Sequence, residues 1–349
     1  MAQSEPLAGI FRRLIANHGP ISLQHFMGEA NARYYASRDP LGAGGDFVTA
    51  PEISQMFGEM VGIWLADMWS RAGRPDRVLY VELGPGRGTL ACDALAVLRR
   101  FGCAPQVHLV ESSPALCAIQ QAQVPEASFH ADLASVPRDG PMLLVGNEFL
   151  DALPVRQMVK AEGGWRERMV GVAGDAFVPV VGNRPMDAAV PQGLKDAPPG
   201  AILETCPGAA AVVDEIARRL AQQAGAAVLI DYGYDGPPPG STLQAVRAHC
   251  KVDPFAAPGE ADLTALVDFS TMAQVARAGG ARVLGIAEQG RWLAALGIGA
   301  RAQALAGAAP AKAGEIEAAL DRLTHAEQMG RLFKVLGLAA TGWPDGAGF

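Results

Sequence analysis

Three glycines that follow a short apolar run form the part of the chain best suited to hold a ligand. The run Val78–Leu83 precedes Gly84, Gly86 and Gly88. A buried strand that ends in glycines lets a ligand approach the backbone closely, because glycine has no side chain and accepts positive φ. Glu82 lies two residues before the first glycine, and its carboxylate favours a cationic ligand and repels a pyrophosphate. The segment therefore predicts a site for a cationic, nucleoside-like ligand.

A dinucleotide site is an alternative for the same glycines. In the register that starts at Gly84, the pattern G-x-G-x-x-G/A fails because its sixth position is Thr89. The register that starts at Gly86 fits, since its sixth position is Ala91 and Glu111 lies about where a ribose-binding acid belongs. A dinucleotide-dependent oxidoreductase and a glycine turn without a ligand therefore both stay open.

Acidic residues follow the next two expected strands. Glu111 ends the second strand, and its two oxygens can accept from both hydroxyls of a ribose. Asp132 follows the third strand and can accept from the amino group of an adenine, while Leu133 packs against the ring. Each acid has a structural alternative, because an acid here also stabilises the start of the following helix. Ligands of open α/β sheets bind at the carboxyl ends of strands, so we expect Glu111, Asp132 and Leu133 at the cofactor site.

A second polar segment, Asn147 to Asp151, follows the fourth expected strand. In a doubly wound sheet this strand lies beside the first, so Asn147 and Glu148 are expected to face the group that is transferred. Glu148 and Asp151 are three residues apart and suit a guanidinium, which keeps its charge and binds carboxylates in bidentate fashion. The alternative is that Asp151 caps the turn and Glu148 is exposed. We take Asn147, Glu148 and Asp151 as the candidate catalytic residues.

The composition excludes several classes of protein. The chain has 349 residues, 50% of them hydrophobic, and a net charge of −7, which argues against a nucleic-acid binder with a basic stripe. No apolar run reaches membrane-spanning length and residues 1–6 lack the blocks of a signal peptide, so we expect a cytoplasmic protein without membrane insertion. The cysteines form no C-x-x-C pair and the histidines no ligand set, which predicts buried free thiols and no metal. The sequence does not predict the oligomeric state.

Alternating strands and helices position the candidate residues. We expect strands at 78–83, 106–111, 128–130, 142–145, 226–230 and 281–287, and helices at 89–100, 115–123, 209–224 and 270–278. This alternation predicts an α/β fold with a doubly wound, Rossmann-like parallel sheet.

Further segments surround the expected sheet. Residues 1–73 are expected to form an N-terminal helical cap and a lid, with helices at 7–17, 23–35 and 53–70. Residues 74–349 are expected to form the main domain, with insertions at about 155–200 and 235–269. The first insertion begins as an antiparallel ribbon, and the second is loop-rich with solvated acids at Asp262 and Asp268. The C-terminal segment is expected to be helical within 291–305 and 314–336.

Taken together, these motifs resemble the arginine methyltransferase family that assists assembly of the respiratory NADH dehydrogenase complex in mitochondria and bacteria. The resemblance runs nearly end to end. Its most specific parts are Thr49-Ala50-Pro51-Glu52 and Glu148-Phe149-Leu150-Asp151-Ala152-Leu153-Pro154. Glu82-x-Gly84-x-Gly86-x-Gly88 is similar to the glycine motif of S-adenosylmethionine-dependent methyltransferases, whose cofactor carries a sulfonium and an ammonium.

The resemblance implies a methyltransferase of Rossmann-like fold, and the abundance of Ala, Gly and Pro fits a bacterial sequence of high genomic GC. It implies S-adenosylmethionine binding at the three glycines and Glu111, with the segment Thr49 to Gln55, including Pro51, near the cofactor as a lid. It also implies an arginine-bearing protein substrate. The chain lacks the paired glutamates of a hairpin loop and the Thr-His-Trp segment of the better-known protein arginine methyltransferases, so Glu148 and Asp151 as guanidinium ligands rest on spacing. A non-catalytic assembly factor of the same fold stays an alternative.

Overall fold

The computed structural model describes residues 5–37, 49–237, 240–247 and 250–349. The start of the matching segment, Gly45 to Val48, lies outside these described residues. The chain divides into two compact units. The first unit contains residues 1–38, 151–209 and 236–266, and the second contains residues 39–150, 210–235 and 267–349. Residues 39–73 thus belong with the sheet-bearing second unit, and residues 1–38 belong with the two insertions. The division falls after residue 38, whereas the expected boundary was after residue 73.

The second unit is built on a mixed sheet. Its order is β4 (Ser128–His130), β3 (Gln106–Val110), β2 (Leu79–Leu83), β5 (Met142–Asn147), β10 (Gly225–Tyr234), β16 (Phe333–Ala339) and β15 (Arg282–Glu288). The strands from β4 to β10 are parallel, and β16 runs antiparallel to both of its neighbours. A short strand, β14 (Val267–Asp268), pairs with the end of β10. The parallel strands therefore bring their carboxyl ends to one edge, where the candidate residues lie.

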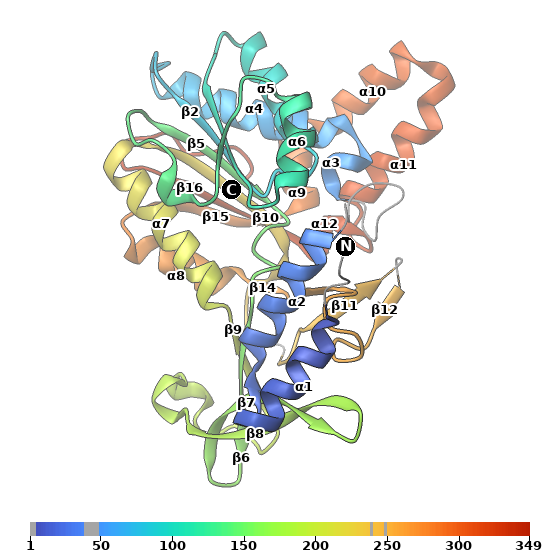
Figure 1. Cartoon of the computed structure of the whole chain (residues 1–349). Coiled ribbons are helices and arrows are strands. Elements are labelled where there is room, and N and C mark those ends of the chain that lie inside the picture. Colours follow the sequence, from blue (N-terminus) through green and yellow to red (C-terminus); the bar gives the residue numbers. More distant parts are fainter. Residues whose placement is uncertain (1–4, 38–48, 238–239, 248–249) are drawn as a thin grey trace. The chain divides into compact units, whose positions relative to one another are not determined.

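Helices cover both faces of this sheet. Figure 1 shows α4 (Gln55–Arg71) and α5 (Thr89–Arg100) on one side and α7 (Pro207–Gln223) and α8 (Phe269–Ala278) on the other. Alternate strand residues such as Tyr80, Val145 and Val228 join the core formed with α4 and α5. Because successive side chains of a strand point to opposite faces, both faces of the central strands are apolar. This explains the continuous hydrophobic runs in the sequence.

Shorter helices complete the second unit. These are α3 (Ala50–Ile53), α6 (Pro114–Gln123) and the single turn η1 (Leu133–Ser135). Between β15 and β16 lie α9 (Gln289–Ala295), α10 (Ile298–Ala308), η4 (Pro310–Lys312), α11 (Ala313–Thr324) and α12 (Met329–Leu332). Among the described residues, no helix combines the length and the apolar character that a membrane crossing requires.

The first unit combines two helices with two small sheets. Its helices are α1 (Leu7–His18) and α2 (Leu23–Ser37). One sheet contains β1 (Ile21–Ser22), β6 (Arg156–Ala161), β7 (Gly164–Ala173), β8 (Ala176–Pro185) and β9 (Ile202–Thr205). Two single turns, η2 (Asp187–Ala189) and η3 (Gln192–Leu194), lie between β8 and β9. The other sheet contains β11 (Gln244–Arg247), β12 (Cys250–Val252) and β13 (Asp262–Thr264). Phe11, Phe26 and Phe177 pack together in its core.

The α/β architecture is confirmed, and several local predictions are wrong. The helix expected from residue 53 is interrupted at Ser54, whose side chain caps α4 by accepting from the N–H of Met56. The segment that ends at Leu336 is not helical throughout, because it enters the sheet as β16 at Phe333. The insertion expected to be loop-rich contains the strands β11, β12 and β13, and Asp262 within it is buried.

The cysteines divide by exposure. Cys103 is buried as expected, but Cys250 is exposed on β12, so the prediction of buried thiols is wrong for that residue.

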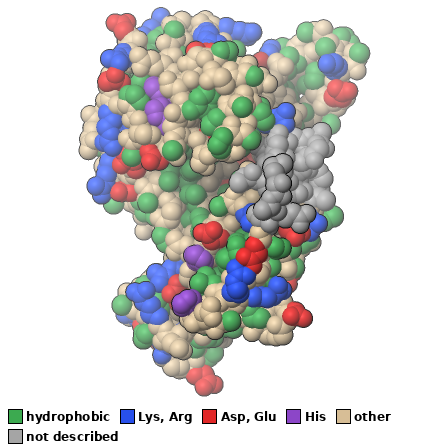
Figure 2. Space-filling view, in the orientation of Figure 1, with side chains coloured by type: hydrophobic (Ala, Val, Ile, Leu, Met, Phe, Trp, Pro, Cys, Tyr) green, Lys and Arg blue, Asp and Glu red, His purple; other side chains and the backbone are tan. Residues whose placement is uncertain are grey.

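Acidic and basic side chains are interspersed over the described part of the face in Figure 2.

Candidate active site

The glycine turn after β2 adopts a backbone that only glycine accepts without strain. Gly84, Gly86 and Gly88 have φ of 59°, 55° and 86°. A side chain at Gly84 would also collide, since its Cβ would lie 2.8 Å from the ring of Phe149. The N–H of Gly88 donates to Pro85 O at 2.8 Å, and Gly88 is the residue before α5. The turn therefore follows a backbone path that favours glycine, packs against Phe149 and ends at the amino end of a helix.

Glu82 lies beneath this turn, inside the sheet. Its side chain is 2% exposed, and the hydroxyl of Tyr80 donates to its Oε2 at 2.6 Å. Burial raises the pKa of Glu82 to about 7, and the hydrogen bond from Tyr80 opposes that rise. A cation above the turn would favour the charged carboxylate. Direct contact of Glu82 with the cofactor stays a prediction.

Glu111 is joined to the glycine turn through a residue that the sequence did not single out. Its Oε1 accepts from the N–H of Ser113 at 2.7 Å, and its Oε2 accepts from Gln120 Nε2 at 3.3 Å. The same Nε2 donates to Gly86 O at 2.8 Å, and Gln120 is 0% exposed. Gln120 therefore fixes the distance between the turn and the acid. Its signal in the sequence is a polar residue one turn after Leu116 on the buried face of α6.

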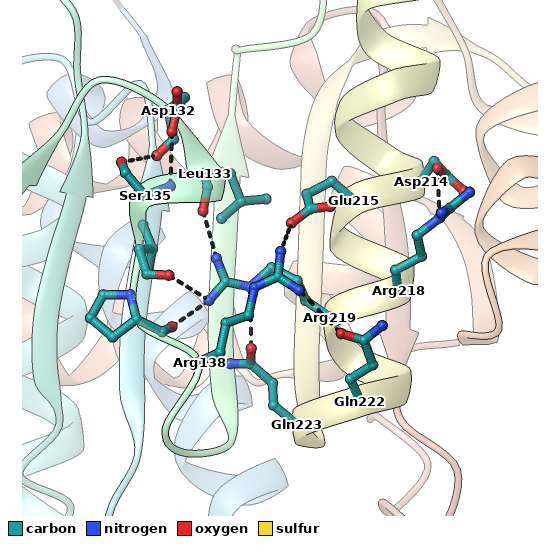
Figure 3. Close-up of polar contacts among 12 residues, drawn as sticks. Asp132, Leu133, Ser135, Arg138, Asp214, Glu215, Arg218, Arg219, Gln222 and Gln223 are labelled. Carbon is teal, nitrogen blue, oxygen red and sulfur yellow. Dashed lines mark hydrogen bonds and ion pairs between the residues drawn. The ribbon is translucent and has the colours of Figure 1, made fainter.

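Asp132 and Leu133 begin the segment after β4. Asp132 caps η1, because its Oδ1 accepts from the N–H of Ser135 at 2.9 Å, which is the structural alternative foreseen for this residue. Leu133 is buried, and its carbonyl accepts from Arg219 Nη1 at 2.6 Å (Figure 3). The cap uses one carboxylate oxygen and does not test the expected adenine contact.

Glu148 stands at the end of β5 in an uncommon conformation. Its φ is 51°, a value that costs a residue with a side chain of the order of 1 kcal/mol or more. Its Oε1 accepts from the N–H of Ala50 at 3.0 Å and from Asn147 Nδ2 at 3.1 Å. Its own N–H donates to Ile230 O at 2.9 Å. Backbone strain of this kind persists only where the surroundings fix it, and it concentrates at functional sites.

Asp231 holds the loop that carries Glu148. It lies at the end of β10 and is 1% exposed. Its Oδ2 accepts from the N–H groups of Phe149 and Leu150 at 3.2 and 2.9 Å, and its Oδ1 accepts from the N–H of Tyr232 at 2.9 Å. Three backbone donors of two strand ends thus meet one carboxylate.

The lid segment is anchored at the same edge of the second unit. Thr49 precedes α3, and Pro51 is buried at the first turn of that helix. Glu52 accepts a hydrogen bond from Thr89 Oγ1, at the start of α5. The lid is thus bonded to the glycine turn's helix through Glu52 and to β5 through Ala50, a role for Glu52 that sequence reasoning missed.

A group of acids lies behind the lid. Arg301 donates to Glu59 of α4 through Nε and Nη2, each at 2.6 Å. Burial, followed by the charges of Glu59 and Glu52, raises the pKa of Asp93 to about 6. Arg301 thus balances the charge of Glu59, while burial disfavours the charged form of Asp93.

Asp151 belongs to the first unit. It is buried, and its carbonyl accepts from the N–H of Ala265 at 3.0 Å. Glu148 belongs to the second unit, so the expected pairing of these two carboxylates on one guanidinium stays a prediction.

Comparison with known proteins identifies the cofactor. A family model for S-adenosyl-L-methionine-dependent methyltransferases matches residues 60–287. The mouse protein arginine methyltransferase NDUFAF7, mitochondrial, is 34% identical over 97% of this chain and 86% of its own length. The Drosophila melanogaster homolog is 35% identical over 95% of this chain and 84% of its own length.

A crystal structure of a similar protein supports both the fold and the cofactor. A Burkholderia thailandensis protein bound to S-adenosyl-homocysteine matches with a TM-score of 0.84 and 30% identity, over 98% of this chain and 95% of that one. These findings favour the methyltransferase prediction over the dinucleotide alternative.

The residues of the second unit fit S-adenosylmethionine. The glycine turn places three positive-φ glycines at the amino end of α5, and acids stand within or just after β2, β3 and β4. Gln120 Oε1 is buried and has no hydrogen-bond partner among the described residues. The cofactor is S-adenosylmethionine, and the chain belongs to the family of S-adenosyl-L-methionine-dependent methyltransferases.

Proposed function

We propose that this methyltransferase modifies an arginine of a protein substrate. The observation that carries the proposal is the carboxylate of Glu148, held by Ala50 and Asn147 at the carboxyl end of β5 on a strained backbone. A fixed carboxylate at the transfer site suits a guanidinium, which binds oxygens through a planar set of donors. The proposal also draws on the name of the NDUFAF7 relatives, which are protein arginine methyltransferases.

Glu148 acts by orientation. When bound, S-adenosylmethionine would supply a methyl group: the bond from carbon to the sulfonium sulfur breaks, a bond to a guanidinium nitrogen forms, S-adenosylhomocysteine leaves, and that nitrogen releases a proton to solvent. Glu148 accepts from one side of the guanidinium and draws its positive charge there, which leaves the opposite nitrogen more nucleophilic. Ala50 and Asn147 keep the carboxylate in place, so the substrate meets an organised group and the cost of alignment falls.

The substrate class follows from the resemblance. We propose a subunit of the respiratory NADH dehydrogenase complex as the target, modified in the cytoplasm of a bacterium. Asp151 is proposed as a second guanidinium ligand from its spacing to Glu148. A non-catalytic assembly factor remains the competing function, and it would bind the same partner without methyl transfer.

Labelled cofactor tests the proposal. The purified protein is incubated with methyl-labelled S-adenosylmethionine and a lysate from cells that lack its gene, and labelled bands are hydrolysed and analysed for methylated arginine. We expect at least one labelled band that contains methylarginine. Label on another amino acid would contradict the proposed substrate. A protein that binds the cofactor and labels no band would support the assembly factor.

A further inference from the structure

Arg219 of α7 is the largest charged side chain buried in the second unit. It is 0% exposed. Its Nη1 donates to Leu133 O at 2.6 Å, and its Nη2 donates to Val136 O at 3.1 Å and to Pro137 O. Its Nε donates to Gln223 Oε1 at 3.2 Å. Figure 3 shows the guanidinium reaching from the helix to three carbonyls of one short turn.

Burying the guanidinium of Arg219 costs more stability than filling the same space with an apolar side chain would. All the acceptors named above are neutral oxygens, and burial lowers the pKa of Arg219, as does the charge of Arg138, against the opposing charge of Glu215. A buried charge without a bonded counterion costs more than an apolar side chain of similar volume. What the guanidinium adds is direction, because its donors form a rigid planar fork that fixes several carbonyls at once.

The segment held by Arg219 contains Asp132 and Leu133. Residues 131–141 connect β4 to β5 with only the single turn η1, so the segment has few backbone bonds of its own. Side chains of the helix α7 supply further contacts to this segment. Arg138 bonds Glu215 at 2.6 Å and Gln222 at 3.1 Å, and Gln223 donates to Gly140 O at 2.9 Å. One face of α7 therefore sets the position of the whole connection.

We propose that Arg219 is a positioning residue for base recognition: by fixing the carbonyls of residues 133, 136 and 137 it holds Asp132 and Leu133 against the adenine of the cofactor. The inference rests on the predicted adenine contacts of those two residues. It does not depend on the protein substrate, since the cofactor binds through its base without an arginine.

Calorimetry with two ligands tests the inference. S-adenosylhomocysteine and its inosine analogue, in which a keto oxygen replaces the 6-amino group, are titrated into the wild-type protein, Arg219→Met and Arg219→Lys. The matched control is Arg218→Met, the neighbouring residue on the same helix, whose side chain is 62% exposed and pairs with Asp214 at 2.9 Å. Circular dichroism confirms that each variant is folded.

We expect Arg219→Met to bind S-adenosylhomocysteine at least tenfold more weakly than the wild type. The inosine analogue should weaken less, because it lacks the amino group that Asp132 accepts from and loses only the packing against Leu133. Preference for adenine would thus collapse, with a partial loss in Arg219→Lys and a change below twofold in Arg218→Met. A folded Arg219→Met that loses both ligands equally, or neither, would overturn the inference. If Arg219→Met does not fold, Arg219→Lys decides, and an unchanged preference in that variant overturns the inference. Failure of the wild type to methylate arginine would leave these binding results unaffected.

Discussion

The carboxylate of Glu148 accepts a hydrogen bond from the backbone N–H of Ala50 at 3.0 Å. The two residues are far apart in the sequence, one at the end of β5 and the other in the lid. The bond makes the position of the proposed substrate-binding carboxylate depend on the lid. Glu52 of the same short helix accepts from Thr89 at the start of α5, so α3 is bonded both to the helix after the glycine turn and to the residue after β5.

Replacement Glu148→Gln is expected to abolish methyl transfer and to leave cofactor binding intact. The amide oxygen can still accept from Ala50, but the amide carries no charge for a guanidinium. We expect transfer to fall at least a hundredfold, about 3 kcal/mol of transition-state stabilisation, while S-adenosylhomocysteine affinity in calorimetry changes less than threefold. Glu317→Gln, on the exposed surface of α11, is the control and should match the wild type. Full transfer by Glu148→Gln would remove Glu148 from the mechanism.

Replacement Gly84→Ala separates backbone strain from loss of space. Gly84 and Gly174 share a φ of 59°, but a Cβ at Gly84 would lie 2.8 Å from Phe149, whereas Gly174 has nothing within 4 Å. Both variants should lose about 1 kcal/mol of stability from strain. Only Gly84→Ala should lose a further 1 to 3 kcal/mol, roughly the cost of overpacking, and bind S-adenosylhomocysteine at least tenfold more weakly. Equal behaviour of the two variants in urea unfolding and calorimetry would contradict this view of the turn.

Replacement Asp231→Ala should affect both stability and transfer. It leaves three backbone N–H groups without their carboxylate, so we expect a loss of about 3 kcal/mol in urea unfolding. The loop from Phe149 to Leu150 then loosens, and kcat should fall more than the affinity for the cofactor. The control is Asp268→Ala, which removes an exposed cap of α8 that accepts from Thr271 at 3.0 Å, and should cost about 1 kcal/mol without a change in kcat. An Asp231→Ala protein with unchanged kcat would exclude a positioning role.

The order of strands and helices was predictable because each apolar run has a distinct length and is bounded by glycine, proline or a capping residue. The run Phe333–Ala339 was one exception. It follows α12 directly and is buried on both faces between β10 and β15, so it shows neither the helical period nor the strand alternation. A fully buried strand and a buried helix cannot be separated by period alone.

The candidate site was predictable where a single segment carries it, as at the three glycines. It was not predictable where contacts join distant segments. Gln120, Arg219 and Asp231 act on Gly86, Leu133 and Leu150, and each pair is brought together by the order of strands in the sheet. The sequence alone does not reveal these partners, so it shows each of the three only as an isolated polar residue on an apolar helix or strand.

Glu82 makes the stability of the protein depend on pH. Its pKa in the folded protein is about 7, above its ordinary value of 4.5, so the folded protein holds a proton that the unfolded chain releases between these values. The stabilisation from protonated Glu82 is therefore complete below pH 4.5 and is lost as the pH rises towards 7. The loss amounts to about 3 kcal/mol by linkage.

Replacement Glu82→Gln should remove this dependence. The amide keeps an acceptor for Tyr80 and cannot ionise, so the free energy of unfolding of the variant minus that of the wild type should increase from pH 5 to pH 8 and then stay constant. Urea unfolding at pH 5, 6, 7 and 8 measures the difference, and subtraction cancels the contribution of Asp93, whose pKa is also raised. A saturating cationic cofactor should shrink the increase, because its charge favours ionised Glu82, whereas neutral S-adenosylhomocysteine should shrink it less. A difference that does not vary with pH would show that Glu82 is ionised in the folded protein throughout this range.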